Sequence, residues 1–170
     1  GVSQLRPRVL FVAFRKDLAG HFAWPDALPG QPPTVGELLH DLMAARGWKG
    51  ADEWRERACD IAPTLVGGSK KHGGPDLGPT RAKRAWESLG VDGKGVADLA
   101  PDSDFVGMPR LTIRMTARVQ GFPDYWQFSG KKTAVYRQIG NAFPPPVAKA
   151  VGQQIVAALS EAAKPKLKRA

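Results

Sequence analysis

Glycine and proline interrupt the centre of this chain so densely that long regular elements are excluded there. Residues 63–79, PTLVGGSKKHGGPDLGP, contain five glycines and three prolines. Glycine raises the entropic cost of ordering a helix or strand, and proline lacks the amide hydrogen that both elements use. Residues 16–33 have the same texture and are expected to form loop. Regular structure is therefore expected only in short pieces around these stretches.

Local patterns predict one strand and several helices. Residues 8–15, RVLFVAFR, form a short apolar run whose length and composition favour a buried strand. Thr34 and Glu37 have the spacing of a capping box, which predicts a helix that ends at Gly47. Further helices are expected over residues 51–59, 80–90 and 112–120, with loop over 91–108. The last helix is expected to begin at residues 144–146 and to carry an apolar stripe of Val147, Val151, Ile155 and Leu159.

The charge balance restricts the partners of the chain. It has 25 Lys and Arg against 16 Asp and Glu, a formal net charge of +9. This excess suits nucleic acid or an anionic membrane surface, although a basic domain without such a partner also fits. No apolar run approaches the ~20 residues of a membrane helix, and no signal peptide is indicated. The start at Gly1 suggests that the natural reading frame begins earlier. A single cysteine, Cys59, excludes an internal disulfide and is compatible with the cytoplasmic location that we expect.

Residues 4–8, QLRPR, are the first of three segments with side chains suited to binding. Arg6 and Arg8 are two residues apart at a predicted strand entry, so they point to the same side of the chain. Two guanidinium groups there can grip phosphate or a carbonyl oxygen. The alternative is a solvated strand end.

The other two segments lie near the C-terminus. In residues 110–124, RLTIRMTARVQGFPD, Arg114 and Arg118 share a helical face and suit an anion or acidic partner. The alternative is that they pair with carboxylates inside the protein. In residues 136–148, YRQIGNAFPPPVA, a Gly-Asn pair precedes a predicted helix N-terminus, where backbone N–H groups can hold a polar or anionic ligand group. The alternative is a capped loop without a ligand.

In this order, the three segments resemble the last three motifs of the bacterial-type DNA cytosine-5 methyltransferase family. QLRPR is similar to the family's Q-x-R-x-R, and RLTIRMTARVQGFPD to its R-x-L-T-x-R-E-x-A-R-x-Q-x-F-P-D, with a one-residue difference at the start. YRQIGNAFPPPVA is similar to Y-x-Q-x-G-N-(S/A)-(V/F)-x-P-x-(V/P). Met115 stands where the family usually has Glu, which removes one internal ion pair.

The resemblance implies an α/β fold: the C-terminal part of a Rossmann-like S-adenosylmethionine-dependent methyltransferase with an irregular, loop-rich target recognition domain inserted. Residues 1–15 would end the catalytic-domain sheet, 16–109 would form the recognition domain, 110–163 would return to the catalytic domain, and 164–170 would be a basic tail. The final helix is expected to pack on the sheet. Most sheet neighbours would be missing from this chain, so its exposed apolar surface is expected to be covered by self-association or by another chain.

The family transfers a methyl group from S-adenosylmethionine to C5 of a cytosine that is flipped out of a specific duplex sequence, often in restriction-modification systems. Its Pro-Cys nucleophile, its Glu-Asn-Val segment and its glycine-rich cofactor site are not in this chain. Cys59 lies in RACDIAP without the preceding proline and is rejected as the nucleophile. The chain alone is therefore predicted to be inactive. It would act on double-stranded DNA with an N-terminal methyltransferase half, from the same gene or a separate subunit, and without metal or membrane.

The resemblance also implies roles for individual residues. Arg8 would enter the cytosine pocket and hold the base carbonyl, Arg6 would contact the DNA backbone or support the pocket, and Gln4 would orient the segment. Asn141 and Ala142 would lie against cofactor and flipped nucleotide. A structural role at the base of the recognition domain is implied for Arg110, Thr112, Arg114 and Arg118.

Within the middle region, two basic stretches are the candidates for DNA contact. Base contacts are expected from the glycine loop, whose close backbone approach and polar donors suit a DNA groove: Gly67, Gly68, Ser69, Lys70, Lys71 and His72. Phosphate contacts are expected from the helix that follows, through Arg81, Lys83 and Arg84. The alternative for the glycine loop is a flexible, solvated basic loop.

Three readings of the whole chain remain open. It is part of a methyltransferase, as a piece of a longer chain, a truncated product or one half of a split enzyme; or a stand-alone, non-catalytic, sequence-specific DNA-binding module; or a basic RNA- or protein-binding domain with fortuitous motifs. The first two predict DNA affinity with strong salt dependence. Only the split enzyme predicts methyl transfer once an N-terminal partner is supplied.

Overall fold

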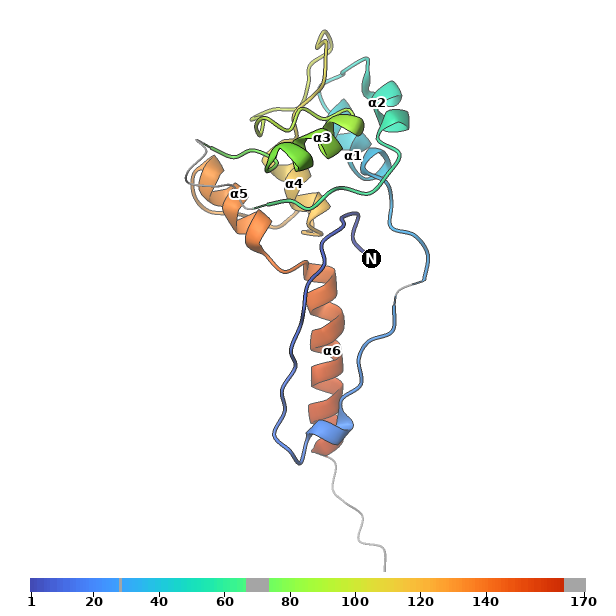
Figure 1. Cartoon of the computed structure of the whole chain (residues 1–170), viewed down its shortest axis with the longest axis vertical. Helices are drawn as coiled ribbons and strands as arrows, with labels where there is room; N and C mark the ends of the chain where they lie inside the picture. The colour runs from blue at the N-terminus through green and yellow to red at the C-terminus, as the bar shows by residue number, and fades with distance from the viewer. Residues whose placement is uncertain (28, 67–73, 164–170) are drawn as a thin grey trace, which may run out of the picture.

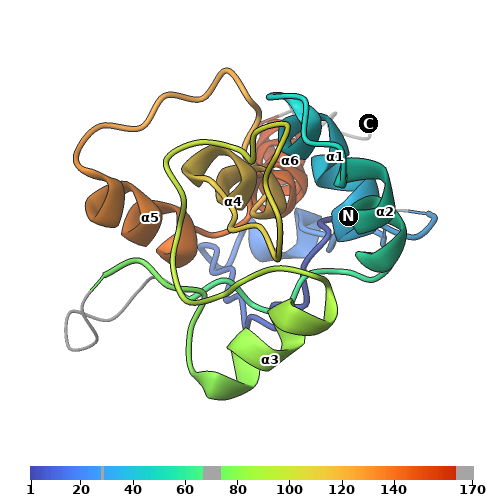
Figure 2. The same cartoon turned by 90° about the horizontal axis from the view of Figure 1, so that it is seen from above.

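Helices dominate the computed structural model, which describes residues 1–27, 29–66 and 74–163. In chain order the described elements are η1 (Ala19–His21), α1 (Val35–Ala44), α2 (Ala51–Arg57), α3 (Thr80–Ser88), α4 (Ile113–Val119), α5 (Lys132–Asn141) and α6 (Pro145–Ala162). Figure 1 shows α1 to α5 gathered in one rounded part, from which α6 extends with two extended stretches of the N-terminal third beside it. Figure 2 shows the same arrangement from above, with α3 and α5 at the outside.

Local capping signals explain where two of the helices begin. Thr34 caps α1 and makes the predicted capping box with Glu37, which confirms that expectation. Thr112 caps α4 in the same way, but its partner at the third helical position is Met115. The Met115 sulfur accepts the Thr112 amide at 3.3 Å, so the thioether occupies the place of the family's usual carboxylate. The capping contact is therefore made even though Met115 stands where the family usually has Glu.

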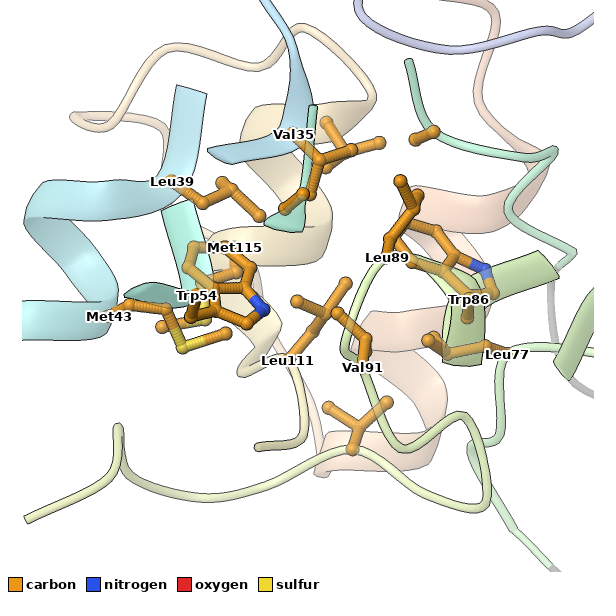
Figure 3. Packing of buried hydrophobic residues seen from close by; sticks show 14 of the residues in the cluster. Val35, Leu39, Met43, Trp54, Leu77, Trp86, Leu89, Val91, Leu111 and Met115 are labelled. Carbon is orange, nitrogen blue, oxygen red and sulfur yellow. The ribbon is translucent and has the colours of Figure 1, made fainter. Parts of the chain in front are cut away.

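One hydrophobic core holds the rounded part together. Figure 3 shows Leu39 of α1, Trp54 of α2, Trp86 of α3 and Met115 of α4 converging with loop residues such as Val91. Burying large apolar side chains contributes about 25 cal/mol per Å² of area removed from water. The core contains residues both from the predicted recognition region, 16–109, and from the C-terminal segment that follows it. These two stretches therefore fold as one packed body.

Glycine is required where α1 meets α2. A Cβ atom at Gly36 would lie 2.2 Å from the carbonyl oxygen of Arg55, well inside the contact distance of real Cβ atoms. The two helices make the most extensive contact between any described elements. The small residue therefore allows the close approach of their backbones.

The predicted strand over residues 8–15 is wrong for this chain. The segment is extended but has no partner strand, and the exposed fractions of Val9 and Phe11 are 79% and 89%. A strand needs a neighbour to pair its backbone groups, and β-pairing in the described residues is limited to isolated bridges such as that of Gln4 with Ala62. The catalytic-domain sheet that residues 1–15 were expected to end, with most of its strands outside this chain, is therefore not formed in the described residues.

The C-terminal end also differs from the prediction. No helix was predicted over α5, and Gly140 and Asn141 are its last residues, not the residues immediately before the next helix. Prolines occupy the first two positions of α6 and have no N–H to offer an anion, so a ligand there would depend on the side chain of Asn141 and its neighbours, whose predicted role stays a prediction.

The apolar stripe of α6 lacks the sheet on which it was expected to pack. Only Val151 of this stripe is buried, whereas Leu159 is 46% exposed. The helix instead lies against η1.

Candidate functional site

The segment QLRPR is anchored to residues 62–65 by its backbone and by one buried side chain. Leu5 donates to the Ala62 carbonyl and Ala62 donates to that of Ser3, both at 2.8–2.9 Å. The buried Gln4 amide accepts from the Leu65 backbone N–H at 2.8 Å and donates to the Gln120 side-chain oxygen at 2.7 Å. Residues close to the N-terminus, in the middle and in α4's C-cap thus meet at one polar cluster.

Arg6 extends this cluster to the end of α5. Its guanidinium donates to the carbonyl of Leu65 and, at 2.5 Å, to that of Gly140. A cation is favourable there because the last carbonyls of a helix lack partners within the helix. Burial, followed by repulsion from Arg8, lowers the pKa of Arg6. Arg6 was expected to bind phosphate or a carbonyl oxygen. In the structure its guanidinium binds two backbone carbonyls of the chain itself.

Gln120 completes the cluster and was not among the predicted site residues. It is fully buried, and its amide donates at 2.5 Å to the carbonyl of Ala142. The available signal was its match to the Q of the family's A-R-x-Q-x-F-P-D segment. The three predicted segments are thereby brought together.

Two side chains at the edge of the cluster face solvent. Arg8 is exposed, and in the described part of the chain its guanidinium donates to the carbonyl of its neighbour Pro7 at 2.9 Å. Asn141, next to the Ala142 carbonyl, is exposed as well. A guanidinium and an amide in these positions can bind a carbonyl, phosphate or other polar group.

The four residues predicted to be structural all make contacts within the chain. Arg110 pairs with Asp92 at 2.8 Å, and Arg114 donates to the carbonyl of Trp126 at 3.0 Å. Arg118 donates to the Leu38 carbonyl and pairs with two carboxylates, those of Asp41 and Asp124. Thr112 caps α4, so all four residues make contacts inside the protein. For Arg114 and Arg118, such internal contacts are the alternative to binding an anion or acidic partner.

The predicted DNA contacts are only partly within the described residues. The base-reading candidates 67–72 lie outside the described residues. On α3, Arg81 and Arg84 are exposed, and the structure gives them no partner in the part of the chain it describes. Lys83 is instead paired with Asp76 at 2.6 Å and lies partly buried beside Gly93. Two of the three predicted phosphate ligands are therefore free to bind.

Within residues 1–27, 29–66 and 74–163, no group of three or more His, Cys, Asp or Glu side chains could hold a metal ion. Over the same residues, no helix has the length and apolar character needed to cross a membrane. Cys59 is exposed just after α2.

Comparison with known proteins gives the family. The model of the C-5 cytosine-specific DNA methylases matches residues 1–157, and the chain belongs to this family. The match begins at the first residue, so it includes the QLRPR segment even though the strand after it does not form.

Among its relatives are two Type II methyltransferases. The chain is 62% identical to M.NaeI of Lentzea aerocolonigenes over 94% of its own length and 39% of that protein. It is 56% identical to M.NgoMIV of Neisseria gonorrhoeae over 95% of its length and 52% of that protein. M.Sau96I of Staphylococcus aureus is 30% identical over 94% of the chain and 41% of that protein. The chain thus spans only about two fifths to one half of these relatives.

Proposed function

We propose that this chain is the C-terminal portion of a DNA cytosine-5 methyltransferase and supplies its DNA-recognition region together with part of its cytosine and cofactor pockets. The observation that carries the proposal is the cluster that joins Gln4, Arg6, Gln120 and Ala142, because it assembles the three family segments from positions far apart in the chain. The Type II methyltransferase relatives support a place in a restriction-modification system.

Arg8 and Asn141 are the residues proposed to meet the reacting groups. Gln4 and Arg6 fix the backbone on the N-terminal side of Arg8, whose exposed guanidinium would hold the carbonyl of a cytosine rotated out of the duplex. S-adenosylmethionine, when bound, supplies the methyl group. The exposed Asn141 amide fits a contact with a polar group of that cofactor, whereas the Ala142 carbonyl is already bound by Gln120.

The middle region, residues 16–109, is proposed to bind the DNA. Arg81 and Arg84 would contact phosphates, with a smaller part for Lys83 because Asp76 already neutralises it. Residues 67–72 remain the proposed base-reading segment.

The N-terminal half of the enzyme is the proposed partner. It would bring the Pro-Cys nucleophile and the remaining sheet, on which residues 8–15 would pair and the α6 stripe would pack. The exposed Val9 and Phe11 support this arrangement, since large apolar side chains are rarely left uncovered together. Methyl transfer would then take place in the assembled protein, in the cytoplasm and without metal.

Methyl transfer from labelled S-adenosylmethionine to mixed-sequence duplex DNA tests the proposal. The chain is assayed alone and together with an N-terminal methyltransferase half. We expect activity only in the mixture, and bisulfite sequencing of the product then identifies the target. Activity of the chain alone would show that this chain contains a nucleophile of its own, contrary to the proposal. Salt-sensitive DNA binding without activity in either assay would favour the stand-alone recognition module.

A further inference from the structure

Three side-chain and backbone amides in the polar cluster form a relay with a fixed direction. The Leu65 N–H donates to the Gln4 oxygen, the Gln4 amide donates to the Gln120 oxygen, and the Gln120 amide donates to the Ala142 carbonyl. Each glutamine uses its oxygen toward one side and its NH₂ toward the other. This order of donors and acceptors fixes the orientation of both side-chain amides, because turning either amide over would set donor against donor or acceptor against acceptor.

Both ends of the relay are backbone atoms in functional segments. Leu65 belongs to the middle region proposed to bind DNA, and its N–H and C=O are bound by Gln4 and Arg6, respectively. Ala142 directly follows Asn141 at the end of α5, and Arg6 binds the neighbouring Gly140 carbonyl. A displacement of Leu65 thus acts through short hydrogen bonds on Gln4 and Arg6, which precede Arg8, and on Gly140 and Ala142, which flank Asn141.

Burial makes these bonds hard to replace. Gln4 is 5% exposed and Gln120 is fully buried, so water has little access to either amide. A buried amide that loses its partner stays unsatisfied, which strengthens the preference for the intact relay.

We propose that Gln120 is a positioning residue of the methyl-transfer reaction. Together with Gln4 it couples the backbone at Leu65, within the region 16–109 proposed to bind DNA, to the backbone at Ala142 in the proposed cofactor and cytosine pocket. Correct docking of target DNA then fixes the pocket, and incorrect docking displaces it. This inference rests on the proposed function.

The test uses the assembled enzyme with Gln120→Leu, which keeps similar bulk but cannot donate or accept. The quantity measured is the ratio of kcat/KM on the duplex site that the wild type methylates to kcat/KM on a site with one base pair changed. A loss of folded enzyme lowers both rates equally and leaves this ratio constant. We expect the ratio to fall at least about fivefold, mainly through a lower kcat on the target.

Gln127→Leu is the matched control, because Gln127 is an exposed glutamine outside the three family segments, and its amide donates to the Tyr125 carbonyl at 3.3 Å. Its ratio should stay within about twofold of the wild type. If Gln120→Leu does not fold, Gln4→Asn, which keeps an amide but is too short to hold both partners, replaces it. An unchanged ratio in the folded variant overturns the coupling. A wild-type enzyme that methylates no cytosine overturns the proposed function instead.

Discussion

Replacing Arg118 with methionine should show how much one guanidinium contributes to the packing of α1 on α4. The arginine side chain is only 18% exposed and donates to the Leu38 carbonyl at 3.0 Å. It also pairs with Asp41 and Asp124, whose side chains are 64% and 52% exposed. Methionine keeps most of the aliphatic length and removes every one of these bonds.

The magnitude follows from the exposure of the partners. The bond to the carbonyl contributes about 1 kcal/mol, and each solvent-screened ion pair about 0.5–1 kcal/mol. Arg118→Met should therefore lower the free energy of unfolding by about 2–3 kcal/mol. Urea denaturation of the 170-residue chain at pH 7, followed by tryptophan fluorescence, measures it. Arg55→Met, on the exposed face of α2, should change stability by less than about 0.5 kcal/mol.

The pH dependence of the same difference gives a second check. The hydrogen bond from Arg118 lowers the pKa of Asp41 below its ordinary value. A carboxylate with a lowered folded pKa adds stability above its unfolded pKa of about 3.9, and this is lost as the pH falls through the folded value. The gap between wild type and variant should be full at pH 6–7 and narrow below about pH 4. A variant within 0.5 kcal/mol of wild type at pH 7, or a gap independent of pH, refutes the reasoning.

Three further perturbations test the packing and the surfaces. Gly36→Ala should cost about 1–3 kcal/mol in denaturant unfolding because its Cβ would overlap an α2 carbonyl, whereas Gly152→Ala on open α6 should stabilise by about 0.5–1 kcal/mol; equal effects would refute the close contact. Arg81→Ala with Arg84→Ala should reduce the slope of log affinity for duplex DNA against log salt by about 1.8, and an unchanged slope would remove α3 from the interface. Phe11→Ser should reduce binding of an apolar dye without shifting Tm, since the ring is exposed; undiminished dye binding would contradict this.

The sequence predicted the helices whose limits are set locally. The signals for these helices, namely Thr34 with Glu37, Thr112, and the prolines at the start of α6, lie within a few residues of each helix start. Those helices begin at or within a residue of the expected positions. The helix α5 was missed because its apolar markers are few. It is held by burying Val135, Tyr136 and Ile139, and such burial depends on what packs against it.

The strand prediction was wrong because a strand depends on a distant partner and not on local signals. RVLFVAFR has the composition of a strand, but strands form only in pairs, and the neighbour must come from elsewhere. The candidate site shows the same division. Motif order identified Gln4, Arg6 and Arg8, whereas the meeting of Gln4 with Leu65 and Gln120 depends on a chain path across 61 and 116 residues, which no local pattern encodes.

The extended arm over residues 8–15 has a consequence for how long the chain survives. In the described residues, positions 8–14 make no backbone-to-backbone hydrogen bond. Proteases bind their substrates as unpaired, extended backbone, so cleavage at Arg8 or Arg15 requires no unfolding of the α1–α5 core. Degradation can therefore begin at this arm while the core is still folded, and a β-partner that pairs with the arm would protect it. The lifetime of the chain in the presence of protease therefore reports more directly than its melting temperature whether residues 8–15 are paired with a partner.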